Sequence, residues 1–260
     1  LTNRGLTYDY LGKSDAAIAD YNQALSINPN FHLARINRGT AYATINKDEL
    51  ALADFNEVLK NQPGNKEALD SRGNLFTKQK KFEQALNDYN SILKQDPHFT
   101  NALNKRANVY IEQDRYEEAM NDYRRVLAID PKNKTALFNI GNAYQNKNLF
   151  DSSIHYADEA LRVDPAYHLA RNLRALALFS AGNTDQAAAE LNTVLKAQPT
   201  LVEALNTKGM MMAWQAQYDS AVYYYNKALY LRPGFTDVLN NRGLGYYNQG
   251  LYELAVRDYE

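Results

Sequence analysis

Apolar and small residues recur along this chain at spacings of three and four, which is the spacing of one face of an α-helix. In residues 66–99, Leu69, Gly73 and Phe76 have this spacing and predict a first helix over residues 67–79. The residues on either side of them are mostly polar. The pattern therefore indicates an amphipathic helix with one buried face.

A second helix is predicted over residues 82–95, where Ala85, Tyr89 and Ile92 share another face. Pro97 ends this helix, because proline disfavours helical geometry in the residue before it. The segment between the two helices is only a few residues long. Such a short turn predicts an antiparallel helix pair.

The whole chain repeats this pattern with a period of 34 residues, which we number as positions 1 to 34 starting at Lys66. The seven prolines are each 34 residues after the last. A fixed period of about 34 is typical of a stacked helix-turn-helix array. We expect one array over residues 1–260, whose first and last units are incomplete; its units are 1–31, 32–65, 66–99, 100–133, 134–167, 168–201, 202–235 and 236–260.

Three positions of the unit carry a family resemblance. Position 8 is always glycine or alanine, position 20 is alanine except at Ser153, and position 24 is aromatic except at Ala157 and Leu191. With proline at position 32, the unit resembles the tetratricopeptide repeat. This resemblance implies an all-α fold, a right-handed α-solenoid of stacked antiparallel helix pairs. It also implies that the first helices line a concave groove, with positions 2, 5, 6, 9, 12 and 13 facing a ligand.

A second pattern links positions 7 and 23. Position 7 is an arginine in six units, and an acid stands at position 23 of each of these units; the unit with Ile140 has Tyr156 instead. We predict an arginine–carboxylate pair between helices of one unit or of adjacent units. The alternative is an arginine ladder that faces a ligand.

The predicted groove has a polar part in the third to fifth units. Asparagine offers both a donor and an acceptor, so it can pair with a peptide backbone whatever the peptide's side chains. The alternative is that these residues are ordinary polar surface residues. The candidate peptide-binding residues are Asp70, Asn74, Asn104, Asn108, Asn139 and Asn142.

The sixth to eighth units are more apolar at the same positions. Aromatic residues and methionine are over-represented at binding hot spots, and Trp214 is the only tryptophan. The alternative is packing against the next unit or a missing cap. The candidate peptide-binding residues here are Leu176, Phe179, Met210, Trp214, Leu244 and Tyr247, with Leu173 beside them.

Composition and motifs narrow the function classes. The net charge is −1, so the chain has no basic field for nucleic acid or an anionic membrane. No apolar run has the length of a membrane span. The absence of cysteine fits both the cytoplasm and the periplasm, of which we favour the cytoplasm. The four histidines lack metal-ligand spacing, and no catalytic motif is present, so we expect no metal, no cofactor and no enzymatic activity.

We therefore predict a protein-interaction scaffold that binds an extended peptide or a partner helix in the concave groove. Position 5 has no lysine, which the family's carboxylate clamp requires, so a chaperone-tail adaptor is not expected. The alternative is the substrate- or partner-recruiting region of a larger enzyme or signalling protein whose catalytic domain lies outside this segment. A third hypothesis is an array that self-assembles end to end.

Overall fold

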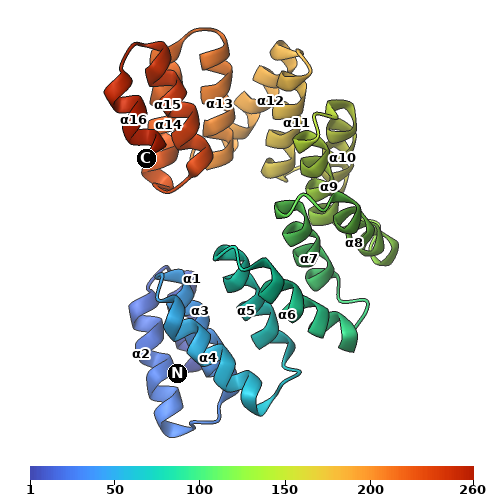
Figure 1. Cartoon of the computed structure of the whole chain (residues 1–260), viewed down its shortest axis with the longest axis vertical. Helices are drawn as coiled ribbons and strands as arrows, with labels where there is room; N and C mark the ends of the chain where they lie inside the picture. Colours follow the sequence, from blue (N-terminus) through green and yellow to red (C-terminus); the bar gives the residue numbers. More distant parts are fainter. The chain divides into compact units, whose positions relative to one another are not determined.

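The computed structural model describes residues 1–260 as sixteen α-helices joined by short turns (Figure 1). It divides into two compact halves, Leu1–Ile129 and Asp130–Glu260, which we describe separately. The helices of the N-terminal half are α1 (Thr2–Tyr10), α2 (Ser14–Ile27), α3 (His32–Thr44), α4 (Asp48–Asn61), α5 (Lys66–Lys78), α6 (Phe82–Gln95), α7 (Thr100–Glu112) and α8 (Tyr116–Ile129). Those of the C-terminal half are α9 (Lys134–Asn146), α10 (Phe150–Val163), α11 (His168–Ser180), α12 (Thr184–Ala197), α13 (Val202–Trp214), α14 (Tyr218–Leu231), α15 (Thr236–Asn248) and α16 (Tyr252–Tyr259).

The prediction of an all-α solenoid of helix pairs is confirmed. Each predicted unit contains one odd-numbered first helix and one even-numbered second helix. The unit of residues 66–99 contains α5 and α6, and the ends of both helices lie within one residue of the predicted ends. That all eight units form one continuous array stays a prediction, because the two halves are separate compact bodies.

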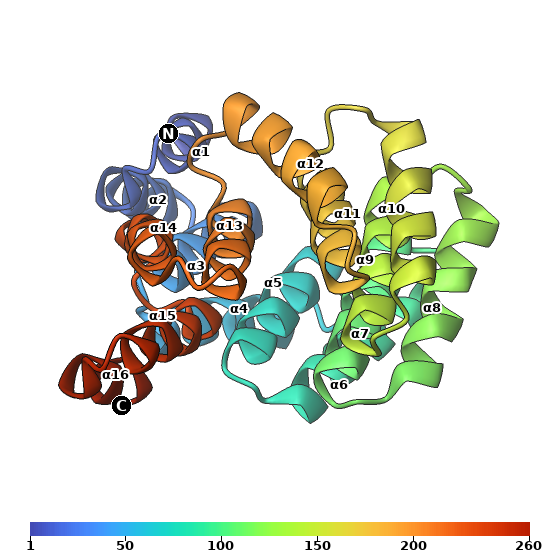
Figure 2. The same cartoon turned by 90° about the horizontal axis from the view of Figure 1, so that it is seen from above.

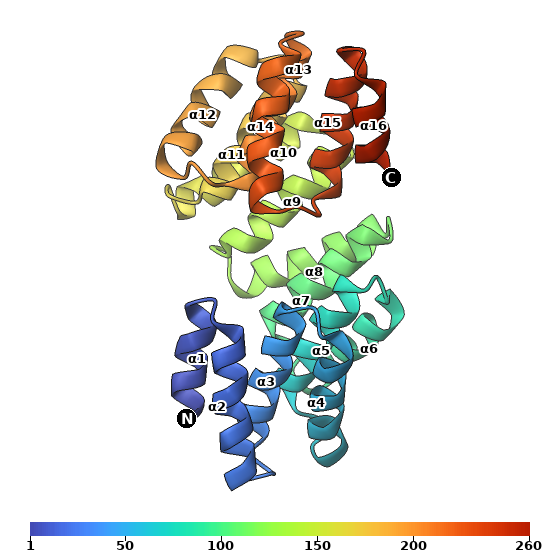
Figure 3. The ribbon, with the colours of Figure 1, turned by 90° about the vertical axis from the view of Figure 1, so that its left-hand side faces the viewer.

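Within each half, the first helices form one layer and the second helices another. In the N-terminal half, α1 contacts α3, α3 contacts α5 and α5 contacts α7, whereas no two second helices come into backbone contact. The C-terminal half repeats this arrangement from α9 to α15. Figure 3 shows α1 to α4 side by side, and Figure 2 views α13 and α14 nearly end-on. We call the surface formed by positions 2, 5, 6, 9, 12 and 13 the first-helix face.

The two helices of a repeat meet where position 8 approaches position 24. A Cβ atom at Gly73 would lie 2.8 Å from Cε1 of Tyr89, a distance that real Cβ atoms essentially never show. Position 24 of the fifth repeat is Ala157, which leaves this space empty of an aromatic ring. Leu173 fills it from the next repeat, 2.8 Å from the Cβ position of Gly141. Leu173 is therefore buried, which corrects its predicted place among the groove residues.

Every turn inside a helix pair contains one residue in the left-handed region, always at position 15. Glycine occupies it in three repeats at no steric cost. In the other five the residue has a side chain, and each of these costs conformational energy. The position-15 residues are Gly12, Asn46, Lys80, Asp114, Asn148, Gly182, Ala216 and Gly250, all with φ between 56° and 87°.

A recurring contact at position 7 joins neighbouring repeats. Arg72 donates from Nε and Nη2 to the carboxylate of Asp88, at 2.9 and 2.7 Å, and from Nη1 to Oδ1 of Asn56, at 2.6 Å. Asp88 belongs to the same repeat and is buried, whereas Asn56 belongs to the preceding repeat. The predicted arginine–carboxylate pair is thus confirmed within one repeat, and the asparagine is a third member that the prediction lacked. The same three-residue contact occurs at Arg38, Arg106 and Arg242.

We expect Ala216→Gly to stabilise the protein by about 1 kcal/mol, because glycine removes the left-handed strain of alanine. The reverse change, Gly182→Ala, is the matched control and should destabilise it by about the same amount. Both residues lie in open turns, so neither change alters packing. Equilibrium urea unfolding measures both. Stabilisation by Gly182→Ala would contradict the conclusion that a side chain at position 15 strains the backbone.

We expect Arg72→Ile to destabilise the protein by about 3 kcal/mol, because the buried Asp88 carboxylate would lose its counter-charge. The double variant Arg72→Ile/Asp88→Tyr copies the residues at Ile140 and Tyr156, and should recover most of this loss. Urea unfolding of both variants is the test. An equally unstable double variant would show that the fork geometry itself, and not an unpaired charge, sets the cost.

Candidate functional site

The only ionic contact between neighbouring first helices on the predicted polar surface is between Asp70 and Lys105. Nζ of Lys105 in α7 lies 2.6 Å from Oδ2 of Asp70 in α5, and both side chains are largely buried. An ion pair satisfies each charge with the other. The pair therefore connects two first helices, and Asp70 is not an unpaired acid awaiting a ligand.

Two of the predicted asparagines, Asn74 and Asn108, accept hydrogen bonds from tyrosines of the protein itself. The hydroxyl of Tyr89 donates to Oδ1 of Asn74 at 3.0 Å, and that of Tyr123 to Oδ1 of Asn108 at 2.5 Å. Burial raises the pKa of Tyr89 to about 12, so its hydroxyl keeps its proton at neutral pH and can donate. Both asparagines are exposed to solvent, yet the side-chain oxygen of each accepts a hydrogen bond from the tyrosine below it.

The other three asparagines differ from these. The repeat of Asn142 has Ala157 at position 24, so no tyrosine hydroxyl lies beneath this amide. Asn142 and Asn139 are partly exposed on α9. Asn104 is buried in α7, with 8% of its surface exposed. The sequence pattern alone gave these asparagines one role, and the structure gives them different surroundings.

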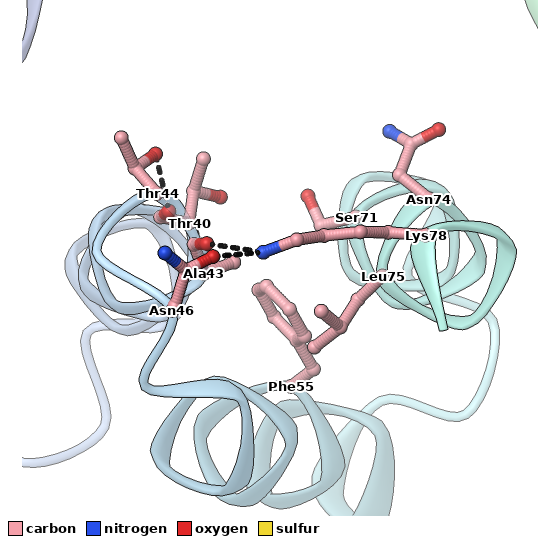
Figure 4. A pocket seen from close by; sticks show the side chains of 9 residues that line it. All are labelled: Thr40, Ala43, Thr44, Asn46, Phe55, Ser71, Asn74, Leu75 and Lys78. Carbon is pink, nitrogen blue, oxygen red and sulfur yellow. Dashed lines mark hydrogen bonds between the residues drawn. The ribbon is translucent and has the colours of Figure 1, made fainter. Parts of the chain in front are cut away.

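A pocket of about 450 Å³ lies between α3 and α5 (Figure 4). Phe55 and Leu75 supply apolar walls. The ammonium of Lys78 points across the pocket to α3, where it donates to the carbonyl oxygen of Ala43 at 3.1 Å and to Oδ1 of Asn46 at 2.8 Å. The ammonium of Lys78 is thus hydrogen-bonded to groups of the protein itself. The polar side chains of the lining are Thr40, Thr44, Asn46, Ser71, Asn74 and Lys78.

Sequence reasoning named only Asn74 among these lining residues. Thr40, Thr44 and Ser71 also occupy positions 9, 13 and 6, so the position rule could have found them. Their small hydroxyl side chains carried less signal than a row of asparagines. Only the contact between α3 and α5 brings these positions around one cavity.

The predicted apolar residues lie on α11, α13 and α15 of the C-terminal half. The ring of Trp214 meets that of Phe179 edge to face, with centroids 5.9 Å apart, and yet 67% of Trp214 is exposed. Leu244 and Tyr247 are also exposed by more than half. Leu176, Phe179 and Met210 are half-buried beside them. Large apolar side chains therefore reach solvent at positions where the first half of the chain has mostly polar ones.

Family models match most of the repeats. Models described as tetratricopeptide repeat match residues 1–31, 76–121 and 138–201, and one described as TPR repeat matches residues 107–148. The chain is a tetratricopeptide repeat protein. A search of curated proteins found no match.

Solved structures share the tetratricopeptide fold at low sequence identity. A tetratricopeptide repeat protein from Parabacteroides merdae is 21% identical with a TM-score of 0.77, over 98% of this chain and 96% of that one. PilW, a type IV pilus biogenesis factor, is 23% identical with a TM-score of 0.59, over 74% and 90%. A structure of the APC/C hetero-tetramer Cut9–Hcn1 is 14% identical with a TM-score of 0.72, over 93% of this chain and 48% of that one.

This tetratricopeptide repeat protein shows neither a metal site nor a membrane-spanning helix. No group of three or more histidine, aspartate or glutamate side chains is placed to hold a metal ion. No helix is both long enough and apolar enough to cross a membrane.

We expect Asn74→Ala to destabilise the protein by about 1 kcal/mol, because the hydroxyl of Tyr89 would lose its acceptor. In a Tyr89→Phe background the same change should cost little, and Phe55 shows that phenylalanine is accepted at this position. Asn142→Ala is the control, since no tyrosine lies beneath it. A double-mutant cycle by urea unfolding measures the coupling. A coupling of zero would mean that Asn74 has no structural role.

Proposed function

We propose that this protein is a non-enzymatic scaffold that binds an extended peptide or a partner helix on its first-helix face. Tetratricopeptide repeats generally mediate protein–protein interaction. Two similar structures fit this class, since one is PilW, a type IV pilus biogenesis factor, and the other is the hetero-tetramer Cut9–Hcn1. A protein or peptide is therefore the partner that we propose.

The exposure of Trp214, Leu244 and Tyr247 is the observation that carries this proposal. Each is more than half exposed, although burying such a side chain is favourable by about 1.5–3 kcal/mol. All three lie on first helices of one half, where α13 contacts α15. Large apolar side chains grouped on one surface are typical of an interface.

The polar part of the first-helix face supports the same function. The pocket between α3 and α5 offers hydroxyls from Thr40, Thr44 and Ser71 next to the amide of Asn74. Hydroxyls and amides can bond a peptide backbone without selecting its side chains. The charged Asp70 and Lys105 satisfy each other. This pairing supports a binding role over acid–base catalysis, and the net charge of −1 favours a protein partner over nucleic acid.

We expect a partner captured from the source organism's lysate by the native protein to be lost with the variant Asn142→Ala/Trp214→Ala/Tyr247→Ala. These side chains face solvent on first helices, so the variant should keep its helical circular dichroism and melting temperature. The matched control is Tyr230→Lys on α14, a second helix, where Tyr230 is 87% exposed. It should retain the partner.

Loss of the partner with Tyr230→Lys, and retention with the triple variant, would move the interface to the second helices and contradict the proposal. Mass spectrometry identifies what is retained in each case.

A further inference from the structure

The two halves of the chain differ in charge on the first-helix face. In the C-terminal half, every residue at positions 9, 12 and 13 of α9, α11, α13 and α15 is uncharged. In the N-terminal half, the same positions include Asp9, Lys78 and Glu112. The surface of the C-terminal half therefore has no charge with which to hold a charged group of a ligand at these positions.

Apolar side chains recur at one position of three neighbouring first helices. Leu176, Met210 and Leu244 all occupy position 9, on α11, α13 and α15. These three helices contact in that order. Trp214 extends from α13 to the ring of Phe179 on α11. The result is a row of apolar side chains at position 9 of three repeats, whereas position 9 in the third, fourth and fifth repeats is asparagine.

The unpaired charge that borders this surface is acidic, Asp237. Position 2 is Glu203 in α13 and Asp237 in α15, and positions 2, 5, 6, 9, 12 and 13 of the C-terminal half include no basic residue. Glu203 is paired with Arg232 at 2.9 Å, whereas Asp237 is exposed. Positions 2 and 9 are two helical turns apart, about 10 Å. The Debye length is about 30 Å at 0.01 M salt, so at low salt Asp237 acts on a ligand bound at position 9.

We infer that the first-helix face of α11, α13 and α15 binds an uncharged, apolar peptide segment flanked by basic residues. This inference rests on the proposed function and specifies the class of its partner. Leucine and aromatic side chains of the segment cover the row at position 9 and the exposed ring of Trp214. A carboxylate in the same place would lose its hydration without meeting a counter-charge, which is unfavourable. Lysine or arginine beyond the segment meets the acidic border.

The test uses Trp214 as its own probe, because it is the only tryptophan of the chain. Two capped synthetic peptides share a central Leu-Phe-Ala-Leu-Phe segment; one has two lysines at each end and the other two glutamates. Titrating the lysine peptide at low salt should shift the emission of Trp214 saturably to the blue. The glutamate peptide should bind about tenfold more weakly, and the difference should shrink as salt is added.

A variant that changes the row at position 9 separates this surface from the rest. Leu176→Asn/Met210→Asn/Leu244→Asn keeps Trp214 and introduces the residue that three other repeats already have at position 9, so the fold accepts it. We expect it to weaken binding of the lysine peptide at least about tenfold. Circular dichroism and urea unfolding verify that it is folded.

The matched control changes exposed aromatic residues on the second-helix layer. The control variant Tyr223→Asn/Tyr230→Lys changes α14. It introduces the residue types that α6 has at the equivalent positions, Asn87 and Lys94. It removes two exposed rings without touching a first helix, so the lysine peptide should bind it as it binds the native protein.

Equal affinity for the two peptides, retained affinity in the position-9 variant, or no saturable shift would each overturn the inference. A different result would contradict the proposed function: the variant Asn142→Ala/Trp214→Ala/Tyr247→Ala would still capture the partner from lysate as the native protein does. A partner that needs the first-helix face, together with failure of both apolar peptides, would keep the scaffold function and reject this specificity.

Discussion

The close approach of position 8 to the ring at position 24 is the contact on which the rest of the structure depends. At Gly73 the ring of Tyr89 occupies the place where a larger side chain would lie. This sets the distance between the two helices of a repeat. At that distance the guanidinium of Arg72 reaches the carboxylate of Asp88 within the repeat and Asn56 in the preceding one. The packing of two helices and the connection of neighbouring repeats thus follow from one small residue.

The same ring links the core to the surface that is proposed to bind a partner. Tyr89 and Tyr123 lie in the core with their hydroxyls directed at Asn74 and Asn108 on the first-helix face. Each amide is thereby oriented from beneath, and an oriented amide loses less conformational freedom when it binds a peptide. A role in stability and a role in binding are compatible for these residues. Asn142 has no tyrosine beneath it and offers a comparison within the same chain.

The two halves present different chemistry on one architecture. The N-terminal half has hydroxyls and amides around a pocket, and a charge pair between Asp70 and Lys105. The C-terminal half has no charged residue at positions 9, 12 and 13 of its first helices, where the ring of Trp214 is exposed. Every repeat keeps the same helix pair although the residues at positions 9, 12 and 13 differ from repeat to repeat. Side chains there can change without changing the helix pair.

The sequence by itself determined the helix pairs and their boundaries, and it predicted that the arginines of position 7 pair with the acids of position 23, because these features recur at a fixed spacing. The structure decided that each pair forms within one repeat, as between Arg72 and Asp88. Only the tertiary structure decided that Leu173 is buried, that Asn56 completes the arginine contact, and that Asn74 bonds to a tyrosine. Each of these depends on which rotamer a side chain adopts and on what the adjacent repeat leaves empty, as Ala157 does beside Gly141. Periodicity specifies the position of a residue in the repeat, whereas packing against the next repeat determines whether that residue is available to a ligand.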